Sequence, residues 1–163
     1  MKRKAAIALG SNLGERLTFL FEAAKQISED VLGDVKGSQV YESKPWGIEE
    51  QPLFLNAVIV GLSEWKAPAI IDYLKQLERD MGRMKSEKNG PREIDLDLIC
   101  LEDDVLDLPG INVPHPRMQD REFVLRPLCD VWAEWTHPIL KKAAAELLKT
   151  HTEDSTVFFA RLL

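Results

Sequence analysis

The chain has 163 residues, a length typical of one domain, and 45% of them are hydrophobic, so it can bury a proper core. Its net charge of -6 disfavours a general affinity for nucleic acid, so any anionic ligand must meet a local cluster of bases. No apolar run reaches the ~18 to 20 residues of a membrane-spanning helix. We therefore expect a single domain over residues 1–163 that binds neither nucleic acid nor membrane.

Two features favour a cytoplasmic location. Basic residues precede the apolar run at 5–9, but this run is shorter than the ~7 to 15 residues of a secretory signal, and we interpret it as a buried strand. The two cysteines, Cys100 and Cys129, are expected to be reduced thiols.

The first half of the chain alternates between strand and helix patterns. Residues 4–9 predict a strand, and the turn at 10–12 (Gly-Ser-Asn) is expected to cap a helix, because Ser and Asn accept bonds from free helix N–H groups. Apolar residues then recur at helical spacing over 13–27. Residues 35–42 predict a second strand, and the proline- and glycine-containing segment 43–52 predicts a loop.

The next segments repeat the pattern. Residues 54–62 predict a third strand, and a second helix begins at Pro68 and ends at Gly82. A charged loop at 82–93 leads to a fourth strand at 94–101. The order βαββαβ usually forms an antiparallel four-stranded sheet with both helices on one face.

The last ~60 residues are rich in proline. Within them, residues 139–149 predict a helix and residues 157–160 form a short apolar tail. We expect this extension to cover the sheet rather than to form a separate domain.

The fourth strand contains two aspartates in an otherwise apolar sequence. In an extended strand, alternate side chains share a face, which groups Asp95 and Asp97 with Ile99 and Leu101. The two Cα atoms would be ~7 Å apart, which suits carboxylates that hold Mg²⁺ together with substrate phosphates. The alternative is that these charges only protect a solvent-facing strand end.

The neighbouring loop favours the ligand-binding interpretation. The segment GRMKSEKNGPR at 82–92 has four basic residues, Arg83, Lys85, Lys88 and Arg92, against the single acid Glu87. Paired acids beside clustered bases have the composition of a metal-phosphate site. Taken alone, the basic segment also fits a solvated loop.

Two further groups of residues suit ligand binding. His115 lies between two prolines, and the arginines that follow it, Arg117, Arg121 and Arg126, favour phosphate binding over a structural histidine. Phe54 and Asn56 share a strand face and together could stack on a planar heterocycle and bond its edge. From these two residues alone, a core phenylalanine and a locally bonded asparagine is the simpler interpretation.

Four sequence blocks resemble a known family. GSNLG near the start, QPLFLNA at 51–57, GPREIDLDLI at 90–99 and VPHPRMQDREFVLRPL at 113–128 resemble the 6-hydroxymethyl-7,8-dihydropterin pyrophosphokinases of folate biosynthesis. The resemblance implies a ferredoxin-like α+β fold, with the C-terminal extension packed on the sheet in a three-layer α-β-α sandwich. It also implies transfer of the β,γ-diphosphate of ATP to the hydroxymethyl group of the pterin, with release of AMP.

The resemblance also implies a set of site residues. Two Mg²⁺ ions would be held by Asp95 and Asp97. The residues around ATP would be Glu78, Arg83, Arg92, His115 and Arg121, and those acting in catalysis Arg83, Arg92 and Asp97. The pterin would contact Ser43, Lys44, Pro45, Trp46, Phe54, Asn56 and Phe123, with the two phenylalanines on its faces.

The chain departs from this family at three positions. Asn89 replaces an aromatic residue before Gly-Pro-Arg, Lys85 replaces a second loop arginine, and Pro116 replaces a tyrosine after the histidine. The competing hypothesis, motivated by the βαββαβ order alone, is a ferredoxin-like module that binds RNA or a small ligand without catalysis. The acidic charge and the lack of an aromatic-rich RNA-binding motif disfavour RNA. We expect a monomer.

Overall fold

The computed structural model describes residues 1–45, 50–83, 90–151 and 156–162. The elements in chain order are β1 (Arg3–Ser11), α1 (Arg16–Asp30), β2 (Gly33–Gly37), β3 (Gln39–Ser43), β4 (Phe54–Ser63), α2 (Ala67–Asp80), β5 (Asp95–Leu101), β6 (Leu106–Leu108), β7 (Ile111–Val113), the 3₁₀ turn η1 (Met118–Asp120), α3 (Glu122–Trp132), α4 (Ala144–Lys149) and β8 (Thr156–Arg161). None of the helices within these ranges has the length and hydrophobicity needed to cross a membrane.

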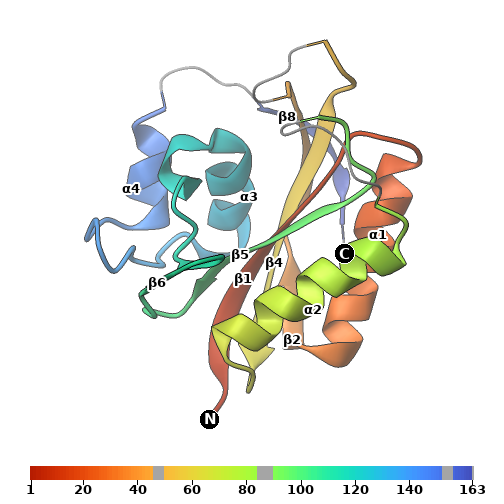
Figure 1. The fold of residues 1–163 in the computed structure, drawn as a ribbon. Coiled ribbons are helices and arrows are strands. Elements are labelled where there is room, and N and C mark those ends of the chain that lie inside the picture. The colour runs from red at the N-terminus through yellow and green to blue at the C-terminus, as the bar shows by residue number, and fades with distance from the viewer. Residues whose placement is uncertain (46–49, 84–89, 152–155, 163) are drawn as a thin grey trace.

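An antiparallel sheet forms the middle layer of the molecule (Figure 1). Its order is β5-β1-β4-β3-β8, and β2 also pairs with β4. The predicted single strand at 35–42 is divided at Ser38, because the Ser38 hydroxyl accepts a hydrogen bond from the Val58 N–H at 2.8 Å and donates one to the Gln39 carbonyl at 2.7 Å. β2 and β3 therefore lie one after the other along the same edge of β4.

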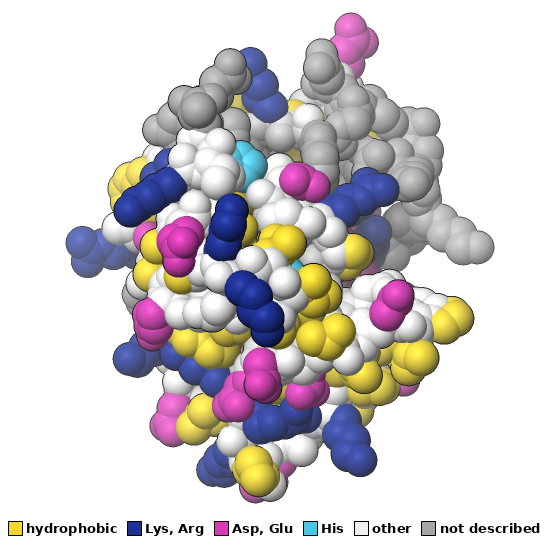
Figure 2. Space-filling view, turned by 90° about the vertical axis from the view of Figure 1, so that its left-hand side faces the viewer, with side chains coloured by type: hydrophobic (Ala, Val, Ile, Leu, Met, Phe, Trp, Pro, Cys, Tyr) yellow, Lys and Arg dark blue, Asp and Glu magenta, His cyan; other side chains and the backbone are white. Residues whose placement is uncertain are grey.

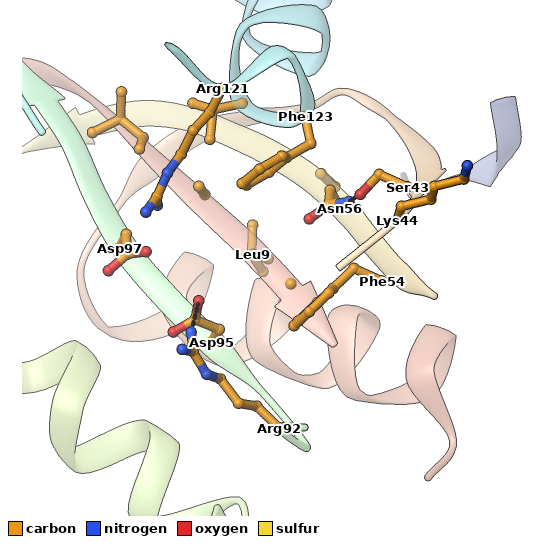
Figure 3. Close-up of a pocket in the computed structure, with 15 residues that line it drawn as sticks. Leu9, Ser43, Lys44, Phe54, Asn56, Arg92, Asp95, Asp97, Arg121 and Phe123 are labelled. Atoms are coloured by element: carbon orange, nitrogen blue, oxygen red, sulfur yellow. Dashed lines mark hydrogen bonds and ion pairs between the residues drawn. The ribbon is translucent and has the colours of Figure 1, made fainter. Parts of the chain in front are cut away.

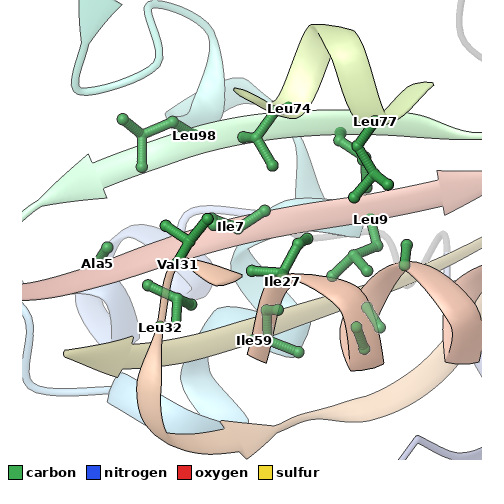
Figure 4. Close-up of a cluster of buried hydrophobic side chains, with 14 of the residues drawn as sticks. Ala5, Ile7, Leu9, Ile27, Val31, Leu32, Ile59, Leu74, Leu77 and Leu98 are labelled. Atoms are coloured by element: carbon green, nitrogen blue, oxygen red, sulfur yellow. The ribbon is translucent and has the colours of Figure 1, made fainter. Parts of the chain in front are cut away.

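Helices cover both faces of the sheet, as predicted. α1 and α2 pack on one face, and α3 and α4 pack on the other (Figure 1). The core under α1 and α2 is built around fully buried side chains of β1, β4 and the helices, including Ile7, Leu9, Ile27, Ile59 and Leu74 (Figure 4). A second core under α3 and α4 includes Ala6, Val58, Val60, Leu125 and Leu128. The α+β class and the three-layer arrangement are confirmed.

The alternation expected for β5 holds only at its beginning. β1 and β5 lose register at Ile99, an extra residue between Leu98 and Cys100. Such a bulge reverses the facing of the residues that follow it. The prediction that Leu101 shares a face with Asp97 is therefore wrong, since Leu101 packs in the core under α1 and α2.

The predicted helix cap at residues 10–12 is also wrong. α1 begins at Arg16 after Glu15, and no side chain caps it. Asn12 instead bonds to Arg92 and to the segment that precedes β4. The side-chain preference for caps was overridden by these longer-range partners.

The C-terminal extension differs from expectation in three ways. The tail adds β8 to the sheet edge beside β3 rather than covering a face, and α3 and α4 provide the cover. α3 was not predicted, because Pro127 inside it gives a helix-breaking signal. The predicted helix at 139–149 begins only at Ala144.

Candidate active site

A pocket opens on the α3 side of the sheet, over the adjoining strands β1, β4 and β5 (Figure 3). Five chain segments supply its lining, namely residues 8–10, 43–44, 54–57, 92–99 and 121–124. Because β1 lies between β4 and β5 in the sheet and α3 packs over these strands, residues as far apart in the sequence as Ala8 and Val124 line one pocket.

One half of this pocket is an aromatic slot. Phe54 at the start of β4 and Phe123 in the first turn of α3 project into the pocket from different sides (Figure 3). Asn56 is 6% exposed, and its Nδ2 donates to the Ser43 hydroxyl at 2.7 Å. Gly10 faces the Asn56 carboxamide without a side chain in between. Two ring faces and a carboxamide edge suit a planar heterocycle.

The other half is a network of acids and bases at the start of β5. Asp95 accepts bonds from Arg83 at 3.1 Å and from Arg92 at 2.9 Å. Glu78 of α2 pairs with the same Arg83 at 2.8 Å and accepts the Leu96 backbone N–H at 2.7 Å. Burial raises the pKa of Glu78, although Leu96 and Arg83 oppose this shift. Asp95 is thus neutralised by two guanidinium groups that phosphate oxygens could recruit.

Asp97 lies beyond this network, in a setting that favours a cation. Burial, followed by repulsion from Asp95 and Glu78, raises its pKa to about 7, and the positive charge of Arg121 opposes the shift. In Figure 3 the Arg121 side chain points toward Asp97 across the pocket. A bound cation would remove the repulsion between the two carboxylates.

The donor set fits Mg²⁺. Asp95 and Asp97 offer hard carboxylate oxygens at one end of the pocket. Within the described ranges, no group of three or more His, Cys, Asp or Glu side chains is arranged to hold a metal ion. A cation on these two aspartates would therefore keep coordination positions for ligand oxygens and water, which is how Mg²⁺ commonly binds beside substrate phosphates.

A second cavity runs along β5 between α2 and the segment after β7. Its lining residues are Ile71, Leu74, Lys75, Leu96, Asp97, Leu98, Gly110, Asn112, His115 and Pro116. Asp97, near the start of β5, is thus a residue that the two cavities share.

His115 is held as a neutral imidazole in this second cavity. Its backbone N–H donates to the Ile99 carbonyl at 2.8 Å, and its Nδ1 accepts the Arg117 N–H at 3.2 Å, which leaves the proton on Nε2. Burial, followed by the positive charges of Arg121 and Arg117, lowers its pKa to about 4, against a smaller opposing effect of Asp95. At neutral pH it offers a ligand one hydrogen-bond donor without a charge.

We predict that the His115 resonances titrate with a midpoint of about 4 in NMR spectra of the ligand-free protein. The physical reason is that the buried ring, beside two arginines, disfavours the imidazolium ion. Comparison with His115→Gln assigns the signals among the three histidines of the chain. A midpoint at the ordinary value near 6.5 would contradict this environment.

The structure brings most of the predicted site residues to these two cavities. The first cavity is lined by Ser43, Lys44, Phe54, Asn56, Arg92, Asp95, Asp97, Arg121 and Phe123, and the second by Asp97 and His115. Glu78 and Arg83 join through their ion pairs. Pro45 is buried beside Lys44 and lines neither cavity. The predictions for Trp46, Lys85 and Asn89 lie outside the described residues.

Sequence reasoning missed two sets of lining residues. Ala8 and Gly10 on β1 form the floor of the first cavity, and their only signal is small size at alternate positions of a strand. The α2 residues Ile71, Leu74 and Lys75 line the second cavity. Their helical spacing is the same as that of ordinary core residues, so the pattern carried no functional signal.

Comparison with known proteins identifies the family of this chain. The family model described as 7,8-dihydro-6-hydroxymethylpterin-pyrophosphokinase matches residues 6–133. The chain is 36% identical over 146 residues to the 2-amino-4-hydroxy-6-hydroxymethyldihydropteridine pyrophosphokinase of Aquifex aeolicus, covering 90% of this chain and 91% of that protein. It is also 36% identical over 132 residues to the enzyme of the same name from Bacillus subtilis, covering 80% and 79% of the two chains.

A solved structure shows the same fold. The HPPK-DHPS of Plasmodium falciparum superposes with a TM-score of 0.68 at 14% sequence identity, covering 92% of this chain and 44% of that longer one. The sequence relatives and the shared fold lead to one assignment: this chain belongs to the 7,8-dihydro-6-hydroxymethylpterin-pyrophosphokinase family.

Proposed function

We propose that each of the two cavities binds one substrate of the family reaction, and that the reacting groups meet beside Asp95 and Asp97 at the start of β5. The reaction of this pyrophosphokinase transfers the diphosphate of ATP to the hydroxymethyl group of hydroxymethyldihydropterin in folate biosynthesis. The aromatic slot takes the pterin, and the cavity along α2 takes the nucleotide. The observation that carries this assignment is that Asp97 lines both cavities.

The pterin assignment rests on shape and polarity. Phe54 and Phe123 offer their rings to the two faces of the heterocycle, and Asn56 offers its carboxamide oxygen, because its nitrogen is bound to Ser43. Backbone groups of Ser43 and Lys44, which line the slot, bind the remaining polar edge. This orientation directs the hydroxymethyl group toward Asp95 and Asp97.

The phosphate assignment rests on charge. Diphosphate transfer breaks the bond between the α,β-bridging oxygen and the β-phosphorus, forms a bond from the pterin hydroxyl oxygen to that phosphorus, and leaves AMP. The transition state is loose and strongly anionic, so positioning and charge neutralisation dominate and no covalent nucleophile is needed. Arg83, Arg92 and Arg121 supply positive charge, and neutral His115 supplies a donor.

We propose that Asp95 and Asp97 hold two Mg²⁺ ions with the triphosphate. Mg²⁺ bound there would neutralise the phosphate charge and lower the pKa of the attacking hydroxyl. A cation on the Asp95 oxygens would compete with Arg83 and Arg92 for that carboxylate, while Arg83 would keep its ion pair with Glu78. Guanidinium groups displaced from Asp95 would be available to the phosphates.

The reaction gives a direct test. Purified protein with Mg²⁺, ATP and the hydroxymethyl dihydropterin is expected to form AMP in equal amount to the pterin diphosphate. Formation of ADP instead would exclude diphosphate transfer.

The competing binding module predicts salt-dependent RNA binding without turnover. Against it, the face formed by α3, α4 and the β6–β7 hairpin has basic and acidic side chains interspersed (Figure 2). Such a mixture does not create the uniform positive field that a nucleic-acid backbone requires. We also propose that the protein acts as a monomer, because the α1 face that carries the exposed acids Glu22, Glu29 and Asp30 does not suit self-association. Light scattering tests this.

Gly10 allows a further prediction about the pterin slot. A Cβ atom at this position would lie 3.5 Å from Asn56 Oδ1 and 3.7 Å from Phe54 Cδ1, so a methyl group fills pocket space without disturbing the backbone. We expect Gly10→Ala to weaken pterin binding roughly tenfold, with ATP binding little changed. The measurement is titration calorimetry with each ligand.

Gly33→Ala is the matched control, because its Cβ atom would meet only the Leu62 carbonyl, at 3.9 Å. This variant should bind the pterin like the unchanged protein. Equal losses of pterin affinity in both variants would contradict the proposed role of Gly10.

A further inference from the structure

Asn12 lies immediately after β1 and lines neither cavity, yet it is 1% exposed and its polar groups make four hydrogen bonds. Its backbone N–H donates to the Arg92 carbonyl at 3.0 Å, and its side-chain oxygen accepts the Arg92 N–H at 2.8 Å. Asn12 therefore forms hydrogen bonds with both polar groups of the Arg92 backbone, the N–H and the carbonyl. Arg92 is the residue whose side chain reaches Asp95 at 2.9 Å.

The other end of the Asn12 side chain fixes its orientation. Its Nδ2 donates to Gln51 Oε1 at 2.8 Å and to the Pro52 carbonyl at 3.0 Å. Because both of these partners accept hydrogen bonds, the amide can take only one orientation, in which its oxygen points toward the Arg92 N–H. The buried side-chain amide of Asn12 thus makes three hydrogen bonds. Leaving its partners without them would cost folding free energy, because the groups are shielded from water.

These contacts connect the two halves of the site. Residues 51–52 lie just before Phe54, the first residue of β4, with only Leu53 between, and Arg92 lies three positions before Asp95, the first residue of β5. An arginine side chain has many rotamers, so the position of its guanidinium group depends on how firmly its backbone is held. Nothing in the sequence pattern required this contact, since Asn12 and Arg92 are 80 positions apart.

We propose that Asn12 is a positioning residue for diphosphate transfer. By binding the N–H and the carbonyl of the Arg92 backbone, Asn12 fixes where the Arg92 guanidinium group lies. This inference rests on the proposed function only for the identity of the anion that Arg92 meets. The positioning itself is a property of the ligand-free protein. Loss of Asn12 leaves Arg92 charged but no longer held in its position beside Asp95.

The test is a double-mutant cycle of Asn12→Ala and Arg92→Ala, measured on kcat/KM for AMP formation. In the unchanged background, we expect Asn12→Ala to lower kcat/KM by about tenfold to a hundredfold, the size of loss that a small misplacement of a catalytic group produces. In the Arg92→Ala background the further loss should be under about threefold, because the group that Asn12 places is already absent. Equal losses in both backgrounds would overturn the proposal.

Ser38→Ala provides the matched control. Ser38 is 3% exposed and also bonds across strands, but to Val58 and Gln39, away from the site. Its effect should be the same with and without Arg92. Thermal unfolding of each variant separates lost stability from lost positioning.

Gln51→Ala covers the case in which the Asn12→Ala variant does not fold. It removes one of the two acceptors that orient the Asn12 amide, so it should lower kcat/KM less than Asn12→Ala and show a smaller coupling to Arg92. The same cycle measured on the dissociation constant of a non-hydrolysable ATP analogue does not require turnover. If the unchanged protein forms no AMP, the proposed function fails, while the binding cycle still confirms or overturns the role of Asn12.

Discussion

Asp97→Ala should abolish diphosphate transfer, with a loss of kcat on the order of 10³-fold or more, while the protein stays folded. The loss in rate follows because Asp97 is the carboxylate that both cavities share and the proposed holder of Mg²⁺. The fold should survive because repulsion from Asp95 and Glu78 and the burial of Asp97 all disfavour its charge. Steady-state kinetics and thermal unfolding measure the two effects.

Two further variants make this prediction specific. Asp97→Asn keeps the size of the side chain but removes its charge, and should lose activity to a similar degree. Asp103→Ala removes an exposed aspartate just after β5 and should leave both kcat and the unfolding temperature unchanged. In the unchanged protein, Mg²⁺ with an ATP analogue should raise the unfolding temperature by more than the analogue alone. If Mg²⁺ raised the unfolding temperature of the Asp97→Ala variant with the analogue by the same amount, metal binding by Asp97 would be refuted.

Phe123→Ala should weaken pterin binding by roughly tenfold to a hundredfold and ATP binding much less. The ring lines the pterin slot but not the cavity along α2, and stacking of a heterocycle on an aromatic ring contributes about 1 to 3 kcal/mol. Titration calorimetry with the pterin and with an ATP analogue gives both dissociation constants. Equal losses for the two ligands would argue against stacking.

The control for this variant must separate stacking from packing, because Phe123 also packs against the core under α3 and α4. Phe123→Leu keeps apolar bulk and should restore stability but not pterin affinity. Phe21→Ala removes a 41% exposed ring of α1 that lines neither cavity, and should not affect pterin binding.

Much of the fold was accessible from the sequence because its signals are local. Hydrophobic spacing placed α1, α2, β1, β4 and β5 within a few residues, and it predicted β2 and β3 as one strand. Period-two alternation correctly put Asp95 and Asp97 on one face. The prediction of α3 failed because Pro127 is a local signal against helix. The capping prediction at Asn12 failed because partners 39 to 80 positions away used the same side chain.

The sequence by itself determined the chemistry of this protein: the two aspartates, the bases around them and the motif blocks that mark the family. Only the tertiary structure decided how that chemistry is arranged. The order β5-β1-β4 brings Asp97 within reach of the aromatic slot, and the bulge at Ile99 turns Leu101 into the opposite core. Both depend on strand pairing between distant segments, which residue periodicity cannot encode because it describes only neighbours in the chain.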